Sequence, residues 1–369
     1  MMMKVVMMLP QSPIPRALLL FAAAISAYCF LLSGLLSPSP SSSLFLSNEQ
    51  HSNNNNNGGI SLERVLKRAA MGGGGGGGGG KNTVILTTLN AAWAEPNSVI
   101  DLFLESFRSG EHTRGLLNHL VIVGLDQKAY SRCLRLHPHC FPLVTPGLDF
   151  QEEAYFMTRQ YLNMMWTRIR FLLSVLEMGF NFVFTDADIM WFRDPFPRFY
   201  PEADFQIACD HFVGSPENMH NKPNGGFTYV KSNNRSIQFF RYWYSSRTTY
   251  PGYHDQDVLN FIKRDPFLRD IGLSIRFLDT AYFGGLCEPS KDLNLVCTMH
   301  ANCCYGLSSK LHDLTLLLQD WKAFLALPPS LKRYRIVSWR APHNCSLGSL
   351  RHYDDSVEQH KLIQHELQE

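Results

Sequence analysis

The order of apolar and polar positions is most regular after residue 81, where short apolar runs alternate with amphipathic stretches. Residues 83–87 and 120–123 are apolar runs typical of buried strands, and residues 98–107 between them have the apolar spacing of a helix. This alternation is typical of βαβ units, in which successive strands are parallel. The pattern therefore predicts an α/β domain with a mostly parallel sheet.

A longer amphipathic segment follows at residues 151–178 and leads into an apolar run at residues 182–184. Its larger apolar side chains recur at helical spacing, at Tyr161, Met165, Ile169, Leu172 and Leu176. Further apolar runs predict strands at residues 205–209 and 226–230, and a helix that begins over residues 257–263. Nothing in this pattern indicates a second domain with its own core.

The N-terminal part contains a segment with the length of a membrane span. Residues 17–36 form an uncharged, largely apolar stretch, which at ~1.5 Å per residue is long enough for a helix to cross a hydrocarbon layer of ~30 Å. Lys4 and Arg16 precede it, and no charge follows until Glu49, so the positive-inside rule leaves residues 1–16 in the cytosol. A cleaved signal peptide is the alternative, but its apolar region is normally shorter, at ~7–15 residues.

Residues 37–81 have the composition of a disordered stem. They are first rich in Ser and Pro, then contain an Asn run at residues 53–57 and a Gly run that begins at Gly72. Such segments bury too little apolar surface to offset the entropy of ordering. Residues 61–68 have a helical pattern that is too short to be stable alone. We expect residues 82–369 to form the single globular domain.

Composition excludes one class of partner and suggests a compartment. The formal net charge is only +2, and there is no local run of Lys or Arg, so nucleic acid is not an expected partner. Eight cysteines follow the apolar segment: Cys133, Cys140, Cys209, Cys287, Cys297, Cys303, Cys304 and Cys345. An even number permits disulfides in an oxidising compartment but does not reveal their pairing. Two glycosylation sequons, at Asn234 and Asn344, are consistent with a secretory route.

The most specific chemical feature is a pair of carboxylates, Asp186 and Asp188, directly after the apolar strand pattern. Ligands of open α/β sheets bind at the carboxyl ends of strands, and two hard oxygen ligands there suggest a divalent cation and a phosphate-bearing substrate. A turn or a helix cap is the simpler alternative. A phosphatase with a phosphorylated aspartate is another, but neither Ile189 nor the residue after it is the Thr or Val of haloacid-dehalogenase-like motifs.

Three later segments contain further polar groups. Residues 224–226, Asn-Gly-Gly, would let backbone approach a ligand closely, or would form a tight turn into a strand. Residues 254–257, His-Asp-Gln-Asp, would cap a helix or project into a site. Residues 297–304 offer three thiols and His300. They suggest a structural zinc site or, through the histidine, a third ligand for a cation at the aspartates.

Taken together and in this order, these segments resemble the plant members of glycosyltransferase family 77, which are nucleotide-diphospho-sugar transferases with a GT-A fold. The similar segments within residues 82–330 are Thr87-Thr88-Leu89-Asn90, Phe184-Thr185-Asp186-Ala187-Asp188, Trp191-Phe192-Arg193-Asp194-Pro195-Phe196, Pro223-Asn224-Gly225-Gly226-Phe227, His254-Asp255-Gln256-Asp257 and Met299-His300-Ala301-Asn302-Cys303-Cys304. The resemblance implies a Rossmann-like GT-A domain in a Golgi-resident, single-pass type II membrane protein. It also implies sugar transfer with retention of anomeric configuration.

The resemblance further implies roles for individual residues. A Mn²⁺ or Mg²⁺ ion would be held by Asp186, Asp188 and His300. The nucleotide sugar would contact Thr87, Thr88, Asn90, Asp186, Asn224, Gly225 and Gly226. The groups near the reacting carbon would be Asp255, Gln256 and Asp257. Either of these two aspartates would stabilise positive charge at that carbon as the diphosphate leaves.

We therefore expect a UDP-sugar-dependent, metal-dependent glycosyltransferase that acts on a cell-wall polysaccharide or a glycoprotein. Xylose, arabinose and galactose donors differ by one hydroxymethyl group or one hydroxyl orientation, and the sequence does not choose among them. The alternative is a non-catalytic, membrane-tethered protein that keeps the fold to bind glycans or to scaffold an enzyme complex. The intact carboxylate motif argues against this alternative, because a scaffold does not need to hold a diphosphate.

Overall fold

The described part of the chain is a single α/β unit. The computed structural model describes residues 60–72, 80–143, 157–334 and 337–345. The expected cytosolic tail (1–16) and membrane anchor (17–36) lie outside these residues. Among the helices that are described, none has the length and apolar character needed to span a membrane.

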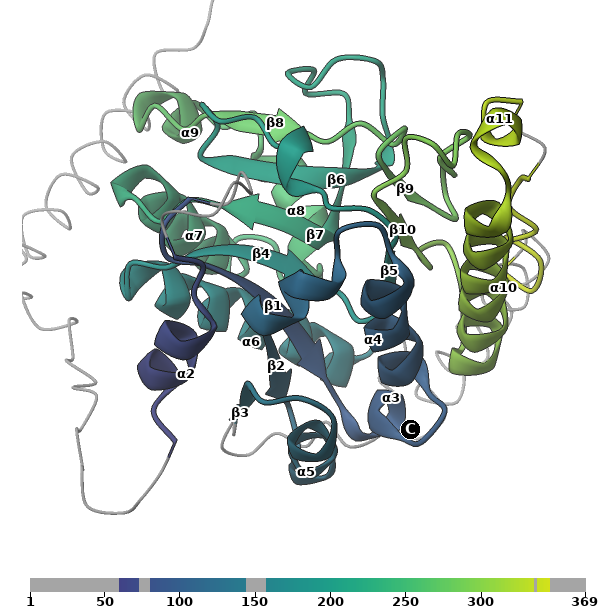
Figure 1. Ribbon diagram of the computed structural model, residues 1–369. Coiled ribbons are helices and arrows are strands. Elements are labelled where there is room, and N and C mark those ends of the chain that lie inside the picture. The colour runs from purple at the N-terminus through teal and green to yellow at the C-terminus, as the bar shows by residue number, and fades with distance from the viewer. Residues whose placement is uncertain (1–59, 73–79, 144–156, 335–336, 346–369) are drawn as a thin grey trace, which may run out of the picture. The chain divides into compact units, whose positions relative to one another are not determined.

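Seven strands form the central sheet, in the order β3-β2-β1-β4-β7-β6-β8 (Figure 1). Their bounds are β1 Thr83–Leu89, β2 Leu120–Gly124, β3 Cys140–Pro142, β4 Asn181–Thr185, β6 Phe205–His211, β7 Lys222–Val230 and β8 Ile275–Phe277. Neighbouring strands are parallel except at β7, which is antiparallel to both β4 and β6. The mostly parallel sheet that the sequence predicts is therefore a mixed sheet with one reversed strand.

A second sheet of three strands lies beyond the end of β4. It has the order β5-β10-β9, with β5 at Ile189–Trp191, β9 at Phe283–Gly285 and β10 at Thr298–His300. Strand β10 is antiparallel to β5, and His300 pairs with Ile189. Because β5 directly follows the two aspartates, this pairing brings His300 beside them from far along the chain.

Helices cover both faces of the large sheet because its central strands are apolar on both faces. In β1, Ile85 belongs to one core cluster, which includes α4 and α10, whereas Val84 and Leu86 belong to another, which includes α6, α7 and α8. Figure 1 shows these helices on opposite sides of the sheet. The helix bounds are α2 Leu62–Ala69, α3 Ala91–Ala94, α4 Val99–Ser109, α5 Gln127–Leu136, α6 Arg159–Glu177, α7 Asn234–Ser246, α8 Asp255–Ile262, α9 Pro266–Asp270, α10 Leu307–Ala326 and α11 Pro329–Lys332.

Two elements begin earlier than the sequence predicts. Helix α8 begins at Asp255, because His254 Nδ1 accepts hydrogen bonds from the first free backbone N–H groups of the helix. Strand β7 begins at Lys222, because it pairs with the far end of β6. The long helix α6 is capped by Thr158, while residues 151–156 of its predicted range lie outside the described residues.

Helix α2 differs from the expectation that residues 37–81 form a disordered stem. It is short, as predicted, but it does not stand alone. Val65, Leu66 and Ala69 are buried in the core cluster that also contains Val121 and Val123 of β2. Burial of this apolar face supplies the stability that the helix lacks by itself. The folded unit therefore includes residues that the sequence places in the stem.

Candidate active site

A cavity of about 410 Å³ lies at the sheet edge where β1 and β4 end. The chain moves from one side of β1 to the other between β3 and β4, which makes this edge a topological switch point where ligands of α/β sheets bind. Because β7 is reversed, its first residues reach the same edge. The cavity is therefore lined by the ends of β1, β4 and β6 and by the start of β7, among them Thr88, Asp186, Asp188, Asp210, Asn224 and Gly226.

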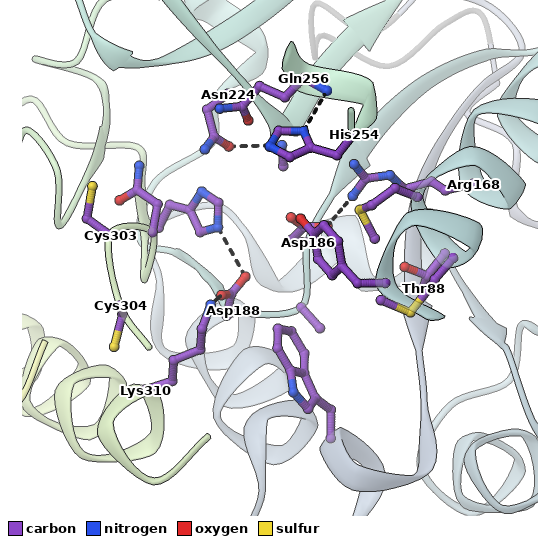
Figure 2. Close-up of a pocket in the computed structure, with 18 of the residues that line it drawn as sticks. Thr88, Arg168, Asp186, Asp188, Asn224, His254, Gln256, Cys303, Cys304 and Lys310 are labelled. Carbon is purple, nitrogen blue, oxygen red and sulfur yellow. Dashed lines mark hydrogen bonds and ion pairs between the residues drawn. The ribbon is translucent and has the colours of Figure 1, made fainter. Parts of the chain in front are cut away.

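Asp188 is almost fully buried between two basic side chains. Lys310 Nζ, from α10, lies 2.5 Å from Oδ2, and His300 Nε2, from β10, lies 3.2 Å from Oδ1. Figure 2 shows Lys310 reaching this carboxylate. Burial by itself would raise the pKa of Asp188, but Lys310 and His300 hold that pKa well below its usual range. Asp188 is therefore ionised at neutral pH.

Arg168 of α6 contacts two other acids of the cavity. Its guanidinium donates to Asp186 Oδ1 at 3.0 Å (Figure 2) and to Asp255 Oδ2 at 2.6 Å, and it lies over the ring of Phe184. Burial raises the pKa of Asp186, and the charge of Arg168 opposes that rise. A single buried cation thus compensates two carboxylates from separate parts of the chain.

The residues present fit a divalent cation. Asp186, Asp188 and His300 each offer one ligand atom, and these atoms lie within 4.8 Å of one another. Among the described residues, the buried Asp188 Oδ1 has no hydrogen-bond partner, although it faces His300 Nε2 at 3.2 Å. In an octahedral site, two neighbouring ligand atoms that are each ~2.1 Å from the ion lie ~3.0 Å apart. The distance of 3.2 Å between Asp188 Oδ1 and His300 Nε2 is close to this value. The two carboxylates suit a hard cation such as Mn²⁺ or Mg²⁺, and the imidazole favours the transition metal of the two.

Asp210 holds one wall of the cavity by binding three side-chain amides. Its Oδ1 accepts hydrogen bonds from Asn224 and Asn302, each at 2.8 Å, and its Oδ2 accepts one from Gln256 at 2.9 Å. The side-chain amide oxygen of Gln256, Oε1, in turn accepts a hydrogen bond from the backbone N–H of Gly225 at 3.0 Å. This network fixes which end of each amide faces the cavity.

Position 226 requires glycine because the side chains of His300 and Asp186 approach its backbone closely. A Cβ at this position would lie 2.6 Å from His300 Cε1 and 2.7 Å from Asp186 Oδ2. Such distances are too short for any side chain, so Asp186 and His300 can lie this close together only over a glycine. Gly226 therefore lies against these two side chains, while Gly225 contributes its backbone N–H to Gln256 rather than lining the cavity.

Besides Gly225, two more predicted site residues lie outside the cavity lining. Thr87 is fully buried and does not line the cavity, because side chains alternate along a strand and Thr88 takes the cavity-facing position. Asp257 is 39% exposed and lies near His254 Nε2, outside the cavity lining. His254, Asp255 and Gln256 do line it, so this segment both caps α8 and contributes to the site.

The sequence analysis did not identify Arg168, Asp210 or Lys310. Arg168 could have been recognised from the sequence, because it is a charged residue on the helix face whose other residues are apolar and predicted to be buried. No local signal marks the other two. The structural zinc alternative is wrong, because Cys303 is bonded to Cys287 and Cys304 to Cys345. A third disulfide joins Cys133 to Cys140, and Cys209 and Cys297 are buried free thiols.

The cavity is acidic, fits a cation and lies at the switch point of an α/β sheet, which is where proteins of this architecture bind their ligands. Residues 115–314 match the family of nucleotide-diphospho-sugar transferases. The chain belongs to this family, which confirms the resemblance to plant glycosyltransferase family 77.

Three relatives from Arabidopsis thaliana illustrate the similarity. The uncharacterized protein At4g15970 is 53% identical over 262 residues, covering 71% of this chain and 69% of that protein. The uncharacterized protein At1g28695 is 40% identical over 70% of this chain and 80% of that protein. UDP-D-xylose:L-fucose alpha-1,3-D-xylosyltransferase 3 is 33% identical over 94 residues, which are 24% of each chain.

Proposed function

We propose that this protein is a GT-A glycosyltransferase that moves a sugar from a UDP-sugar to a cell-wall polysaccharide or a glycoprotein, with retention of configuration. One observation carries the proposal: Asp186, Asp188 and His300 come together at the end of β4, and each offers a ligand atom for a cation. Membership of the nucleotide-diphospho-sugar transferase family supports it. Among xylose, arabinose and galactose, the name of the xylosyltransferase relative favours xylose as the first donor to test.

The cation site accounts for the diphosphate end of the donor. A bound Mn²⁺ or Mg²⁺ ion would neutralise charge on the departing diphosphate. Asp186, Asp188 and His300 would hold that ion. Lys310 lines the same cavity beside Asp188, so its ammonium places a second positive charge near the diphosphate. Its position over the ring of Trp93 further restricts the side chain.

The opposite wall accounts for the sugar end of the donor. Asp255 and Gln256 line the cavity, and the side chain of Asp255 pairs with the guanidinium of Arg168. Its negative charge would stabilise positive charge at the anomeric carbon, and the Asp210 network would orient Gln256 toward the sugar. This arrangement suits retention on one face of the sugar without a side-chain nucleophile. Asp257 has no place in this proposal.

We also propose a luminal, Golgi-resident domain anchored by residues 17–36. The three disulfides support an oxidising compartment, since such bonds are rare in the cytosol. The exposed position of the sequon residue Asn234, at the start of α7, is compatible with that route. Localisation of a tagged full-length chain by microscopy, with protease protection to establish its orientation, tests this part of the proposal.

The transferase proposal is tested by UDP release from a panel of UDP-sugars, using the full-length protein with Mn²⁺ or with EDTA. We expect slow hydrolysis of one donor that is lost with EDTA and falls by at least ~100-fold in Asp188→Asn, because the charge-stabilising site is removed. Asp270→Asn, which changes an exposed aspartate outside the cavity, is the matched control.

Two other results would point elsewhere. A folded protein that neither hydrolyses any donor nor binds UDP in calorimetry, with or without Mn²⁺, would support the glycan-binding or scaffold alternative. Turnover of a simple phosphomonoester that depends on Asp186 would support the phosphatase.

A further inference from the structure

One loop between β10 and α10 supplies much of the cavity lining around Asp188. Residues 301–306 belong to neither a helix nor a strand. Within the described part of the chain, the backbone N–H groups of residues 302–304 donate no hydrogen bond to another backbone group. Regular secondary structure therefore does not hold this loop. The loop residues that line the cavity are Asn302, Cys303, Cys304, Tyr305 and Gly306.

Two disulfides anchor loop 301–306 at consecutive residues. Cys303 is bonded to Cys287, which follows β9. Its neighbour Cys304 is bonded to Cys345, near the end of the described chain. Figure 2 shows both loop cysteines on the side of the cavity where Lys310 lies. Covalent bonds to two separate parts of the chain thus take the place of backbone hydrogen bonds in this loop.

The first of these disulfides lies beside the amide network of the cavity. Cys287 donates its backbone N–H to Asn302 Oδ1 at 3.1 Å, and Asn302 Nδ2 donates to Asp210 Oδ1 at 2.8 Å. Cys287 Sγ itself lies 3.5 Å from the same oxygen of Asp210. The bond between Cys287 and Cys303 therefore holds the loop against the carboxylate that also binds Gln256.

His300 is held in a different way. Its strand, β10, pairs with β5 on one side and with β9 on the other. The backbone carbonyl oxygen of His300 also accepts a hydrogen bond from the N–H of Leu286 at 2.9 Å. Loss of the Cys287–Cys303 bond should therefore leave this candidate cation ligand in place, while it frees the loop that follows.

The Cys287–Cys303 bond is accessible to a reductant. Both cysteines line the cavity and Cys303 is exposed, whereas Cys133 and Cys140 of another disulfide are 0% and 4% exposed. Because thiol–disulfide exchange needs access to a sulfur atom, a dithiol should reduce the cavity-lining bond before the buried one. In that exchange the dithiol gives up two electrons and two protons. Two cysteine thiols form, and the reagent becomes a disulfide.

We propose that the Cys287–Cys303 disulfide positions loop 301–306 for nucleotide-sugar binding, so that its reduction reversibly weakens this binding. The inference rests on the proposed transferase function, in which the diphosphate lies beside Lys310, next to this loop. With the bond intact, the loop is ordered before the ligand arrives. Without the bond, the ligand has to order the loop on binding, and this cost lowers the affinity.

UDP binding to the full-length protein, measured by calorimetry at saturating Mn²⁺, tests the proposal. In Cys287→Ala/Cys303→Ala we expect the affinity for UDP to fall by at least ~10-fold, because several loop side chains must then be ordered on binding. Mn²⁺ binding without UDP, followed by electron paramagnetic resonance, should be unchanged, because β5 and β9 still hold His300. The matched control Cys133→Ala/Cys140→Ala removes a disulfide outside the cavity lining and should keep the wild-type affinity for UDP.

Reduction of wild type provides a second measurement that does not depend on folding of the double variant. After treatment with dithiothreitol and its removal, UDP should bind with the same loss of affinity, and reoxidation should restore it. Mass spectrometry of labelled thiols identifies which bond was reduced.

Two results would overturn the proposal: unchanged UDP affinity once the Cys287–Cys303 bond is absent, or equal losses of Mn²⁺ and UDP binding. In either case a wild type that binds UDP leaves the transferase proposal intact. A wild type that does not bind UDP at any Mn²⁺ concentration would instead contradict the proposed function itself.

Discussion

Arg168→Gln tests whether one buried cation holds the acidic side chains of the cavity together. In the native protein its guanidinium contacts both Asp186 and Asp255, and the side chains of Arg168 and Asp255 are 6% and 2% exposed. Glutamine keeps much of the side-chain volume and hydrogen-bonding capacity but removes the charge. The substitution therefore leaves two carboxylates in a site that excludes most of the water.

The expected cost follows from the burial of each partner. Loss of one partner from a fully buried ion pair costs ~3–5 kcal/mol, because the remaining charge is left uncompensated. Asp255 meets that condition. Asp186 is 26% exposed, so hydration recovers part of its loss. We therefore expect the free energy of unfolding to fall by at least ~3 kcal/mol.

The loss of stability should depend on pH because of Asp186. Burial already raises the pKa of this carboxyl, and the charge of Arg168 opposes that rise. Without Arg168 the pKa of Asp186 in the folded state rises further above its unfolded value of ~3.9. The folded state then binds more protons than the unfolded state between the two pKa values, so the variant loses stability as pH rises through that interval. The difference in the free energy of unfolding between the variant and wild type should be smallest below about pH 4 and largest at neutral pH.

Equilibrium unfolding in urea, at neutral pH and near pH 4, measures both effects. Arg241→Gln is the matched control, because it breaks an Arg–carboxylate pair with Glu177 that is 62% and 40% exposed. Exposed pairs contribute at most ~1 kcal/mol. The double variant Arg168→Gln/Asp255→Asn should recover part of the loss, because it removes a charge that was left unpaired. A cost for Arg168→Gln no larger than that for Arg241→Gln would refute the reasoning.

Two further predictions concern the cation side of the cavity. Gly226→Ala should lower UDP-sugar hydrolysis by ~100-fold while the protein stays folded, because the new Cβ forces Asp186 and His300 apart by several tenths of an ångström or more. Activity within a factor of two of wild type would contradict this account. Lys310→Met should weaken UDP binding by ~10-fold, measured by calorimetry with Mn²⁺, because one charge beside the diphosphate is removed. The control Lys322→Met changes an exposed lysine of the same helix that pairs with Glu105, and equal UDP affinity in the two variants would show that Lys310 plays no such role.

Several parts of the fold were predictable because they depend on local periodicity. Apolar runs located β1, β2 and β4 to within two residues at each end, and the spacing of apolar side chains identified α4 and the described part of α6. The reversed β7 was not predictable, since an apolar run carries no direction. Helix α2 was underestimated for a related reason: its stability comes from packing on the sheet rather than from its own sequence.

The site divides in the same way. The pair Asp186 and Asp188 stands at the end of a strand pattern, so these two candidate ligands of a cation were visible in the sequence. Thr87 and Asp257 were misplaced because the spacing of a motif does not say which side chain of a strand or helix faces a cavity. Asp210 was missed because it is an ordinary aspartate until three amides from separate segments converge on it.

The sequence by itself determined that this protein has an α/β domain, a carboxylate pair at a strand end and the motifs of a nucleotide-diphospho-sugar transferase. Each of these is a property of residues close together along the chain. The tertiary structure alone decided that His300 and Lys310 enclose Asp188 and that Arg168 bridges Asp186 and Asp255. These contacts join distant segments, and their formation depends on the packing of the whole sheet with its helices, which no local pattern of residues encodes.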